Sequence, residues 1–415
     1  MKETLAAVAI DTGDLPLGGG LLALVRPALE RLEPGGVLAV LSSSPAVRED
    51  LPSWCRVERC RYLGLEAMTD GRDRHLVERG GALVAPPPPS ETPLPTRDGR
   101  LLAADVLAAA PMPERARPET GFAPRGAAVE PGGPAYPFSL LERDHVAPPE
   151  VAQLYDQAVA AQWDATRDIP WDKVGRHAPE LESAVGQVMT FLAENELSAL
   201  YVPSRFLPRI HPAYVEVAMF LATQLADEAR HIDVFLKRAR AAGGSLGISS
   251  VTTSRSLLSL MQLEDFTEAA FLLSVLGEGT FLDLLRFVED HAPDEATAEL
   301  SRRARSDESR HVHFGLAHVR HALASDATLY GRLEAAVRRR AATLSGVGGV
   351  PAPLQDALTV LAAGGTQPRA IARGHEAFRG LLDTMHEGRI RRLRHAGFTA
   401  DQAQTISDLH TPNFM

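Results

Sequence analysis

Asp227-Glu228-Ala229-Arg230-His231 returns further along the chain, with one change, as Asp307-Glu308-Ser309-Arg310-His311. In an α-helix a Glu and a His three residues apart leave the same face about one turn apart. Each phrase therefore directs one carboxylate oxygen and one imidazole nitrogen to a common point. Two such phrases supply half of a cage for a pair of metal ions.

Two further acids supply the other half of this cage. Glu196 and Glu278 each lie on the apolar stripe of a predicted helix, where a charge costs several kcal/mol unless it is paired or bound to a cation. Glu228 follows Glu196 by 32 residues and Glu308 follows Glu278 by 30, so antiparallel helices with a rise of roughly 1.5 Å per residue bring them to one height. The sequence predicts one layer of oxygen and nitrogen ligands suited to iron or manganese: Glu196, Glu228, His231, Glu278, Glu308 and His311.

The ligand from the first helix has an alternative. Glu194 stands two residues before Glu196, but its own stripe, Ser183, Gln187 and Thr190, is polar. The periodicity therefore favours Glu196.

The helices that carry the acids are predicted over residues 179–206, from Pro212 onward, over 263–291, and from Pro293 to about 323. A Gly/Ser/Thr-rich connection over 242–256 gives the chain room to cross between the two pairs. Four helices in two pairs joined by a crossover have the topology of a ferritin-like bundle.

The Asp-Glu-x-Arg-His phrase resembles that of di-iron hydroxylases, desaturases and ribonucleotide reductase small subunits, over residues ~180–325. The resemblance implies that Glu196 with His231 and Glu278 with His311 are terminal ligands, and that Glu228 and Glu308 bridge and are catalytic. It also implies that Asp227 and Asp307 hold the N–H of a ligand imidazole. Arg230 and Arg310 either balance these acids or form surface salt bridges.

The same resemblance implies a function. It predicts two iron ions, or manganese with iron, with O2 as co-substrate, in a non-haem di-iron oxygenase or oxidase that oxidises a small organic molecule. An external electron donor or reductase and a homodimer are expected. In such enzymes the residues after the third-helix Glu shape the pocket; here the small Gly279 is expected to make space near the iron. The Thr of several hydroxylases is absent, because Phe281 and Leu282 fill its places and Thr280 comes too early.

Two other functions remain as alternatives. One is a ferroxidase or iron-storage protein without an organic substrate, which a large oligomer would indicate. The other is a sulfur-relay adaptor whose bundle keeps a vestigial cage, which metal analysis would test.

Other residues of the helical region receive a simpler interpretation. Tyr201 and Tyr214 are redox-active candidates, but buried core tyrosines explain them more simply. The segment around Trp163 and Trp171 weakly resembles one that precedes the bundle in some ferritin-like oxygenases, or it is core that caps the bundle. Three histidines near the second phrase follow no acid in register and are expected at solvent or an interface: His313, His318 and His321.

Residues 1–84 predict a small α/β domain, with strands over 5–10 and 37–41, a helix over 21–32 and a third strand near 56–62. Asp11, Gly13, Leu15-Pro16, Pro34-Gly35 and the segment 50–55 resemble the TusA/SirA sulfur-carrier family. That family has a nucleophilic Cys before the Pro, where this chain has Leu15. Leucine carries no persulfide, so the domain is interpreted as a docking or scaffolding module. Cys55 as a substitute carrier lacks support.

The remaining segments complete a four-part division of the chain. Residues 85–150 are predicted to be a proline-rich linker with a short helix over 101–109, and 151–325 hold the ferritin-like bundle. Residues 326–415 are predicted to be a helical extension, with helices over 329–344, 354–363 and 366–395. This extension is assigned to packing, a subunit interface or closure of a substrate pocket.

Composition excludes several classes of protein. The 415-residue chain is 45% hydrophobic and 23% charged, as globular proteins are, and its net charge of -10 disfavours nucleic acid and anionic membranes as partners. The absence of a long apolar run or a signal peptide predicts a cytoplasmic protein. Cys55 and Cys60 match neither a redox pair nor a zinc motif, so reduced, partly buried thiols are expected.

Overall fold

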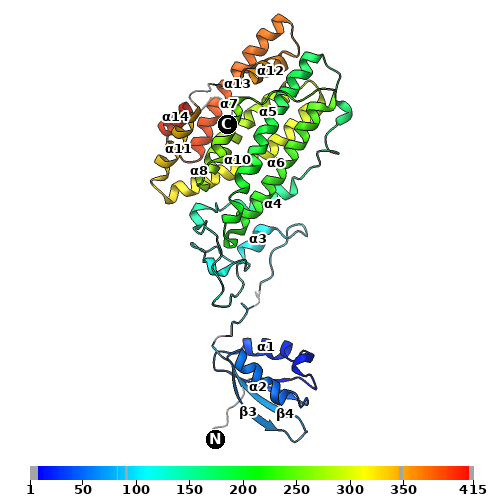
Figure 1. Ribbon diagram of the computed structural model, residues 1–415, viewed down its shortest axis with the longest axis vertical. Coiled ribbons are helices and arrows are strands. Elements are labelled where there is room, and N and C mark those ends of the chain that lie inside the picture. Colours follow the sequence, from blue (N-terminus) through cyan, green and yellow to red (C-terminus); the bar gives the residue numbers. More distant parts are fainter. Residues whose placement is uncertain (1–7, 82, 89–91, 345–348, 411–415) are drawn as a thin grey trace. The chain divides into compact units, whose positions relative to one another are not determined.

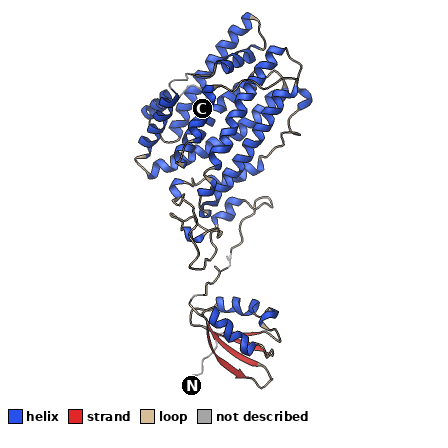
Figure 2. Cartoon of the chain, in the orientation of Figure 1, coloured by secondary structure: helices blue, strands red, loops and turns tan. Residues whose placement is uncertain are grey.

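The chain divides into two compact units. A computed structural model describes residues 8–81, 83–88, 92–344 and 349–410. The first unit comprises the described parts of Met1–Pro93 together with Gly126–Gly133, and the second comprises Leu94–Arg125 with the described parts of Pro134–Met415. Figure 2 shows a sheet with helices beside it in the N-terminal unit and a helical body in the other. A mainly helical chain with a small N-terminal α/β unit is thus confirmed.

The N-terminal unit packs two helices on a four-stranded sheet. The strands have the order β1-β2-β4-β3, and of their pairings only β1 with β2 is parallel. Apolar side chains of the helices, such as Leu29 and Leu51, close a core against Leu38 and Val77. The elements are β1 (Val8–Asp11), α1 (Leu22–Glu30), β2 (Val37–Ser42), α2 (Val47–Val57), β3 (Arg61–Ala67) and β4 (Asp73–Glu78).

The third strand was predicted too early. Helix α2 runs to Val57, because Leu51, Trp54 and Cys55 form a helical stripe that is buried against the sheet. The strand β3 starts only at Arg61, and β4 was not predicted. The first predicted strand begins in residues outside the described ranges. The sulfur-carrier assignment of this unit stays a prediction.

Both thiols of the N-terminal unit are buried and unpaired. Burial, with a smaller contribution from Cys60, raises the pKa of Cys55 to about 12. A thiol that stays protonated and inaccessible is a poor nucleophile. Cys55 is therefore unsuited to replace the missing carrier cysteine.

Four long helical segments form the centre of the second unit. Figure 1 shows α5, α6 and α10 running side by side along this unit. The third segment is continuous through an α-helical, a π-helical and a second α-helical part. Their bounds are α5 (Pro179–Ser204), α6 (Val215–Ala241), then α8 (Phe266–Ala270), η7 (Phe271–Glu278) and α9 (Gly279–Asp290), and finally α10 (Glu295–Ser325).

Local signals explain where these helices begin. Pro179 occupies the first turn of α5, where its missing N–H costs nothing. The side chain of Asp265 accepts a hydrogen bond from the Glu268 N–H at the start of α8. Asp294 does the same for the Thr297 N–H at the start of α10.

Further helices surround this centre. Helix α4 packs on α6, α12 on α5, and α13 on α9. The predicted crossover is only partly irregular, because Ser250 caps a helix that starts at Val251. The surrounding helices are α3 (Ala103–Ala108), α4 (Val151–Ala160), α7 (Val251–Met261), α11 (Leu329–Leu344), α12 (Ala352–Ala363), α13 (Pro368–His395) and α14 (Ala400–Leu409).

The proline-rich segment is attached to the helical unit by a buried ion pair. The guanidinium of Arg125 contacts the carboxylate of Glu216 on α6 and donates to the backbone oxygens of Leu107 and Ala110.

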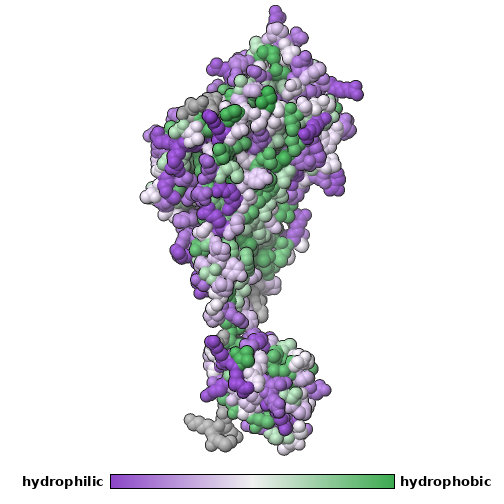
Figure 3. Space-filling view, viewed as in Figure 1, coloured by the Kyte–Doolittle hydropathy of each residue, from purple (hydrophilic) through white to green (hydrophobic). Residues whose placement is uncertain are grey.

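Figure 3 shows apolar residues in a band along the helical unit between hydrophilic flanks. Within the described ranges, no helix combines the length and apolar character needed to cross a lipid bilayer.

Candidate metal centre

Side chains from all four central segments meet in the interior of the helical unit. Two groups of four residues each bring their ligand atoms within 4.8 Å of one another. Each group contains three carboxylates and one imidazole, and the two groups share Glu228 and Glu308. The groups are Glu196, Glu228, His231 and Glu308, and Glu228, Glu278, Glu308 and His311.

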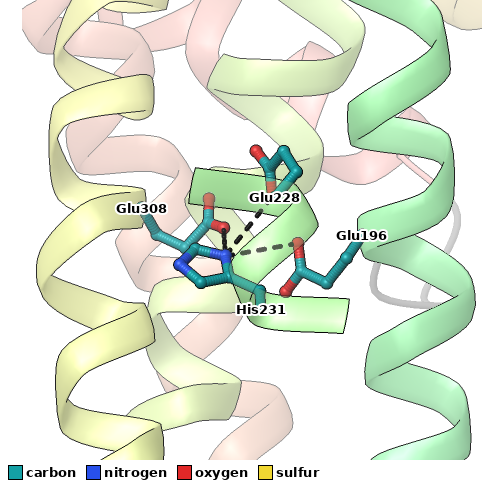
Figure 4. A group of neighbouring side chains, drawn as sticks. All are labelled: Glu196, Glu228, His231 and Glu308. Atoms are coloured by element: carbon teal, nitrogen blue, oxygen red, sulfur yellow. Dashed lines mark ion pairs between the residues drawn. The ribbon is translucent and has the colours of Figure 1, made fainter. Parts of the chain in front are cut away.

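Each imidazole faces the shared carboxylates with the same ring nitrogen. Figure 4 shows His231 between Glu196, Glu228 and Glu308, which come from α5, α6 and α10. Its Nδ1 lies 3.7 Å from Glu196 Oε2 and 3.3 Å from both Glu228 Oε2 and Glu308 Oε1. The Nδ1 of His311 lies 3.0 Å from Glu228 Oε1 and 3.4 Å from Glu308 Oε2.

These contacts do not satisfy the polar atoms. The side chains of all six residues are buried, yet both oxygens of Glu228 and of Glu308 accept no hydrogen bond. The Nδ1 atoms of both histidines also lack a hydrogen-bond partner, as do Glu196 Oε1 and Glu278 Oε2. Buried polar atoms left in this state cost about 1–3 kcal/mol each, and more when charged. Their convergence on two points fits a pair of cations.

The pKa values of these glutamates also show that their negative charges repel one another. The pKa of Glu196 and that of Glu278 lie well above the usual value, because burial and the charges of Glu308 and Glu228 disfavour ionisation. Burial also opposes ionisation of Glu228, but contacts with His311 and His231 outweigh it and lower its pKa. Four ionised carboxylates can be buried together here only with added positive charge. Two dications would neutralise them, since the imidazoles ligate in the neutral form.

The two phrases hold each other's histidine. His231 Nε2 lies 3.2 Å from Asp307 Oδ2, and His311 Nε2 lies 3.3 Å from Asp227 Oδ2. With the proton on Nε2, donated to the aspartate, each Nδ1 keeps a lone pair directed into the cage. The prediction that the aspartates hold imidazole N–H groups thus matches the geometry, in a crossed arrangement.

Two arginines close this arrangement into a ring of charges. Arg230 contacts Asp227 and lies 3.0 Å from Asp307, whereas Arg310 contacts Asp307 and lies 3.2 Å from Asp227. Both guanidiniums are largely buried, so they are not the surface salt bridges that were the alternative. The two arginines neutralise the two aspartates, so this ring adds no net charge beside the cage.

A segment outside the central helices covers the ring. Trp163 Nε1 donates to Asp307 Oδ2 at 2.7 Å, and its ring lies 4.8 Å from the guanidinium carbon of Arg230. Gln162 donates to Asp227 and accepts from Arg230. Sequence reasoning assigned Trp163 only a weak role. The stretch Gln162-Trp163-Asp164 just before the bundle was the only sign in the sequence that this segment has a role at the site.

The π-helical segment ends at the third-helix acid. The wider turn of Phe271–Glu278 places Glu278 in the cage, and such segments are frequent at functional sites. Gln224 of α6 donates to Glu278 Oε1 at 3.1 Å, which leaves Oε2 free. Gln224 was not identified from the sequence.

Nearby residues match their predictions to different degrees, and the prediction for Gly279 was wrong. Gly279 does not make space beside the cage, because a Cβ there would lie 2.7 Å from Nε of Arg392, whose side chain occupies that space. Tyr201 is 56% exposed, whereas Tyr214 is buried and donates to the Leu141 carbonyl as a core tyrosine. Glu194 is half-buried and stands outside both ligand groups.

The three histidines near the second phrase differ from one another in their surroundings. His313 is exposed, as predicted. His318 is fully buried beside Thr267, so its expected place at solvent or an interface was wrong. His321 is half-buried and lies 3.1 Å from Asp144.

A third acidic group has a different role. His177, Glu182 and Asp294 also lie close together, but Arg238 contacts both acids from a fully buried position. A guanidinium already supplies the positive charge there. This group is an ion-pair network at one end of the bundle.

No protein-family model matches the sequence, and no curated protein matches it. Among solved structures, a variant of an R2-like ligand-binding oxidase with a Mn/Fe cofactor superposes with a TM-score of 0.47 at 19% identity, covering 59% of this chain and 92% of that chain. A variant with an Fe/Fe cofactor gives 0.46 at 19% identity, with the same coverage of both chains. A likeness at this level assigns no function to the chain.

Proposed function

We propose that the protein is a non-haem di-iron oxidoreductase that uses O2 to oxidise a small organic molecule. The observation that supports this most directly is the pair of ligand groups sharing Glu228 and Glu308, with their orphaned buried oxygens. An oxygen-rich shell with one imidazole per metal favours iron or manganese over thiophilic metals. One Glu from each of two helices and one Glu-x-x-His from each of two others is the ligand pattern of ferritin-like di-iron and di-manganese proteins.

When bound, a pair of ferrous ions supplies electrons to O2 and so generates an oxidant able to attack C–H or N–H bonds. The chain's own residues prepare the place where this happens. Glu228 and Glu308 would bridge the ions, and Asp227 and Asp307 keep the imidazoles in the tautomer that ligates. The buried indole of Trp163 covers the ring of charges behind the histidines, and Gln162 contacts that ring from the surface.

A small apolar cavity supports access by a small molecule. It lies beside Gln224 and Ser274, and its volume of about 20 Å³ has room for a molecule the size of water or O2. Apolar side chains of α5, α8 and α10, including Val202, Phe266 and Phe314, form the rest of its wall. Gln224 also binds Glu278, so this cavity ends next to one proposed metal position. Larger substrates would require its walls to move.

Metal content tests the proposal directly. After anaerobic loading with ferrous iron, we expect two iron ions per chain in the unaltered protein and at most one in Glu228→Ala or His311→Ala, because each variant removes a converging ligand. Glu194→Ala is the matched control, since it removes a half-buried Glu two residues from Glu196 without touching the cage. It should keep both ions.

Turnover provides the second measurement. Iron-loaded protein with reductant should consume O2 faster when its substrate is present. In Glu228→Ala this rate should be at least ~100-fold lower, which corresponds to an activation free energy higher by roughly 3 kcal/mol. Full iron content and full O2 consumption in Glu228→Ala would contradict the proposal. Iron loading without any organic oxidation, in a very large assembly, would instead indicate iron storage.

A further inference from the structure

An arginine-lined cleft opens on the outer side of the ring of charges. It has a volume of about 750 Å³ and lies between α9 and the first half of α10. Four arginines line it: Arg286, Arg302, Arg303 and Arg305. On a chain with a net charge of -10, such a concentration of cations is unusual.

The acids in the wall of this cleft do not cancel its charge. Asp283 contacts Arg392 from α13, and Asp307 is held by Arg230 and Arg310. Both carboxylates are mostly buried, so positive charge predominates on the accessible surface. Each cleft arginine also contacts an acid outside the lining, Glu289, Asp290 or Glu299. Surface pairs of this kind contribute only ~0–1 kcal/mol, so a carboxylate of a partner can displace them.

The floor of the cleft leads to the proposed metal centre. Trp163 and Asp307 both line the cleft, and the indole N–H donates to the carboxylate at 2.7 Å. The same carboxylate oxygen lies 3.2 Å from Nε2 of His231. Two hydrogen bonds therefore connect Trp163 to the imidazole of His231, and one connects Asp307 to it.

We propose that this cleft docks an acidic one-electron carrier protein of the iron–sulfur or flavin class. This inference rests on the proposed function, which needs an external electron source. Oxygenation of a substrate RH follows RH + O2 + 2 e⁻ + 2 H⁺ → ROH + H2O, and each carrier that docks is oxidised by one electron. Two successive encounters supply both electrons. Complementary charge on the carrier speeds these encounters and makes them sensitive to salt.

Binding to an acidic plant-type [2Fe–2S] ferredoxin and to an acidic flavodoxin tests the proposal, measured by calorimetry at 50 and 300 mM salt. We expect at least one carrier to bind the unaltered protein at low salt and to bind the double variant Arg302→Glu/Arg305→Glu at least 10-fold more weakly. The matched control is Arg338→Glu on α11. Arg338 and Arg302 both have 55% of the side chain exposed, and both pair with a Glu on their own helix. The control should bind the carrier within twofold of the unaltered protein.

The proposal is overturned if neither carrier binds the unaltered protein, if the double variant binds as tightly, or if Arg338→Glu weakens binding equally. Circular dichroism must show the same helix content for all variants. Binding needs no turnover, so it is separate from the proposed function. If dithionite-reduced, iron-loaded protein fails to oxidise any organic molecule while the carrier still binds through Arg302 and Arg305, the oxygenase assignment fails and the docking site stands.

Discussion

Single residues in the helical unit are buried with charges or polar atoms that only specific neighbours can satisfy. His231 and His311 each have one nitrogen bound to an aspartate and the other facing carboxylates. His318, by contrast, has only the hydroxyl of Thr267 at Nε2 and no partner at Nδ1. The same residue type on one helix thus lies in a candidate metal site at one position and in the packed interior at another.

The burial of His318 predicts a pH dependence of stability. Burial, reinforced by His321, lowers the pKa of His318 to about 4. The unfolded chain protonates this imidazole below pH ~6.5, whereas the folded chain resists protonation until about pH 4, so acid favours unfolding. The free energy of unfolding should fall by up to ~3 kcal/mol across this window because of this residue.

Urea unfolding between pH 7 and 4 measures this effect. In His318→Gln the decline over the window should be shallower than in the unaltered protein. His313→Gln, which changes an exposed histidine on the same helix, should keep the original slope. Parallel slopes for all three proteins would contradict the assignment.

At the scale of elements, the π-helical segment and α10 approach each other unusually closely. A Cβ added at Gly315 of α10 would lie 2.7 Å from the Cβ of Ser274 and 3.3 Å from Cγ2 of Val275. Only glycine allows this distance, and Gly315 follows His311 by about one turn. The contact therefore sets the spacing of the two segments that hold Glu278 and His311.

Substitution at this contact should disturb both stability and metal binding. We expect Gly315→Ala to lower the free energy of unfolding by about 1–3 kcal/mol, because α10 must move away from the π-helical segment. Its iron content should fall as well. Gly331→Ala on α11 is the control, since a Cβ there meets nothing within 4 Å and should leave stability unchanged or raise it by up to ~1 kcal/mol. Thermal unfolding and iron analysis measure both, and equal behaviour of the two variants would exclude the close contact.

The elements also show which features a sequence reveals. The layer containing Glu196, Glu228, Glu278 and Glu308 was predictable, because helix periodicity and rise relate sequence intervals directly to positions in space. That these residues bind metal stays a prediction. The π-helical turn was not predictable, because the stretch 271–276 is apolar except for Ser274 and has no period that distinguishes one helix type from another. The bond between Trp163 and Asp307 joins residues 144 positions apart, and no local pattern encodes it.

Across the whole molecule, the two units have separate cores. One is the small sheet unit with its own apolar cluster, and the other is the helical unit that contains every residue of the candidate metal centre. A ligand stabilises the unit whose folded state it binds. Metal binding should therefore stabilise the helical unit alone.

Hydrogen exchange measured by mass spectrometry tests this separation. With ferrous iron at 100 times its dissociation constant, the helical unit gains about 2.7 kcal/mol, so slowly exchanging amides of α5, α6 and α10 should exchange up to ~100-fold more slowly. Amides of β2 and β4 should keep their rates. Slower exchange in these strands as well would show that the units unfold together.

The crossed bonds between aspartates and histidines make each copy of the repeated phrase incomplete without the other. Substitution of Asp227 would remove the hydrogen-bond partner of the His311 imidazole, and substitution of Asp307 would remove that of His231. A half-bundle with one phrase would present an unsupported histidine and an unmatched acid. A substitution in one phrase therefore affects the other. Transferring one phrase and its helix into another scaffold would require transferring the second phrase as well.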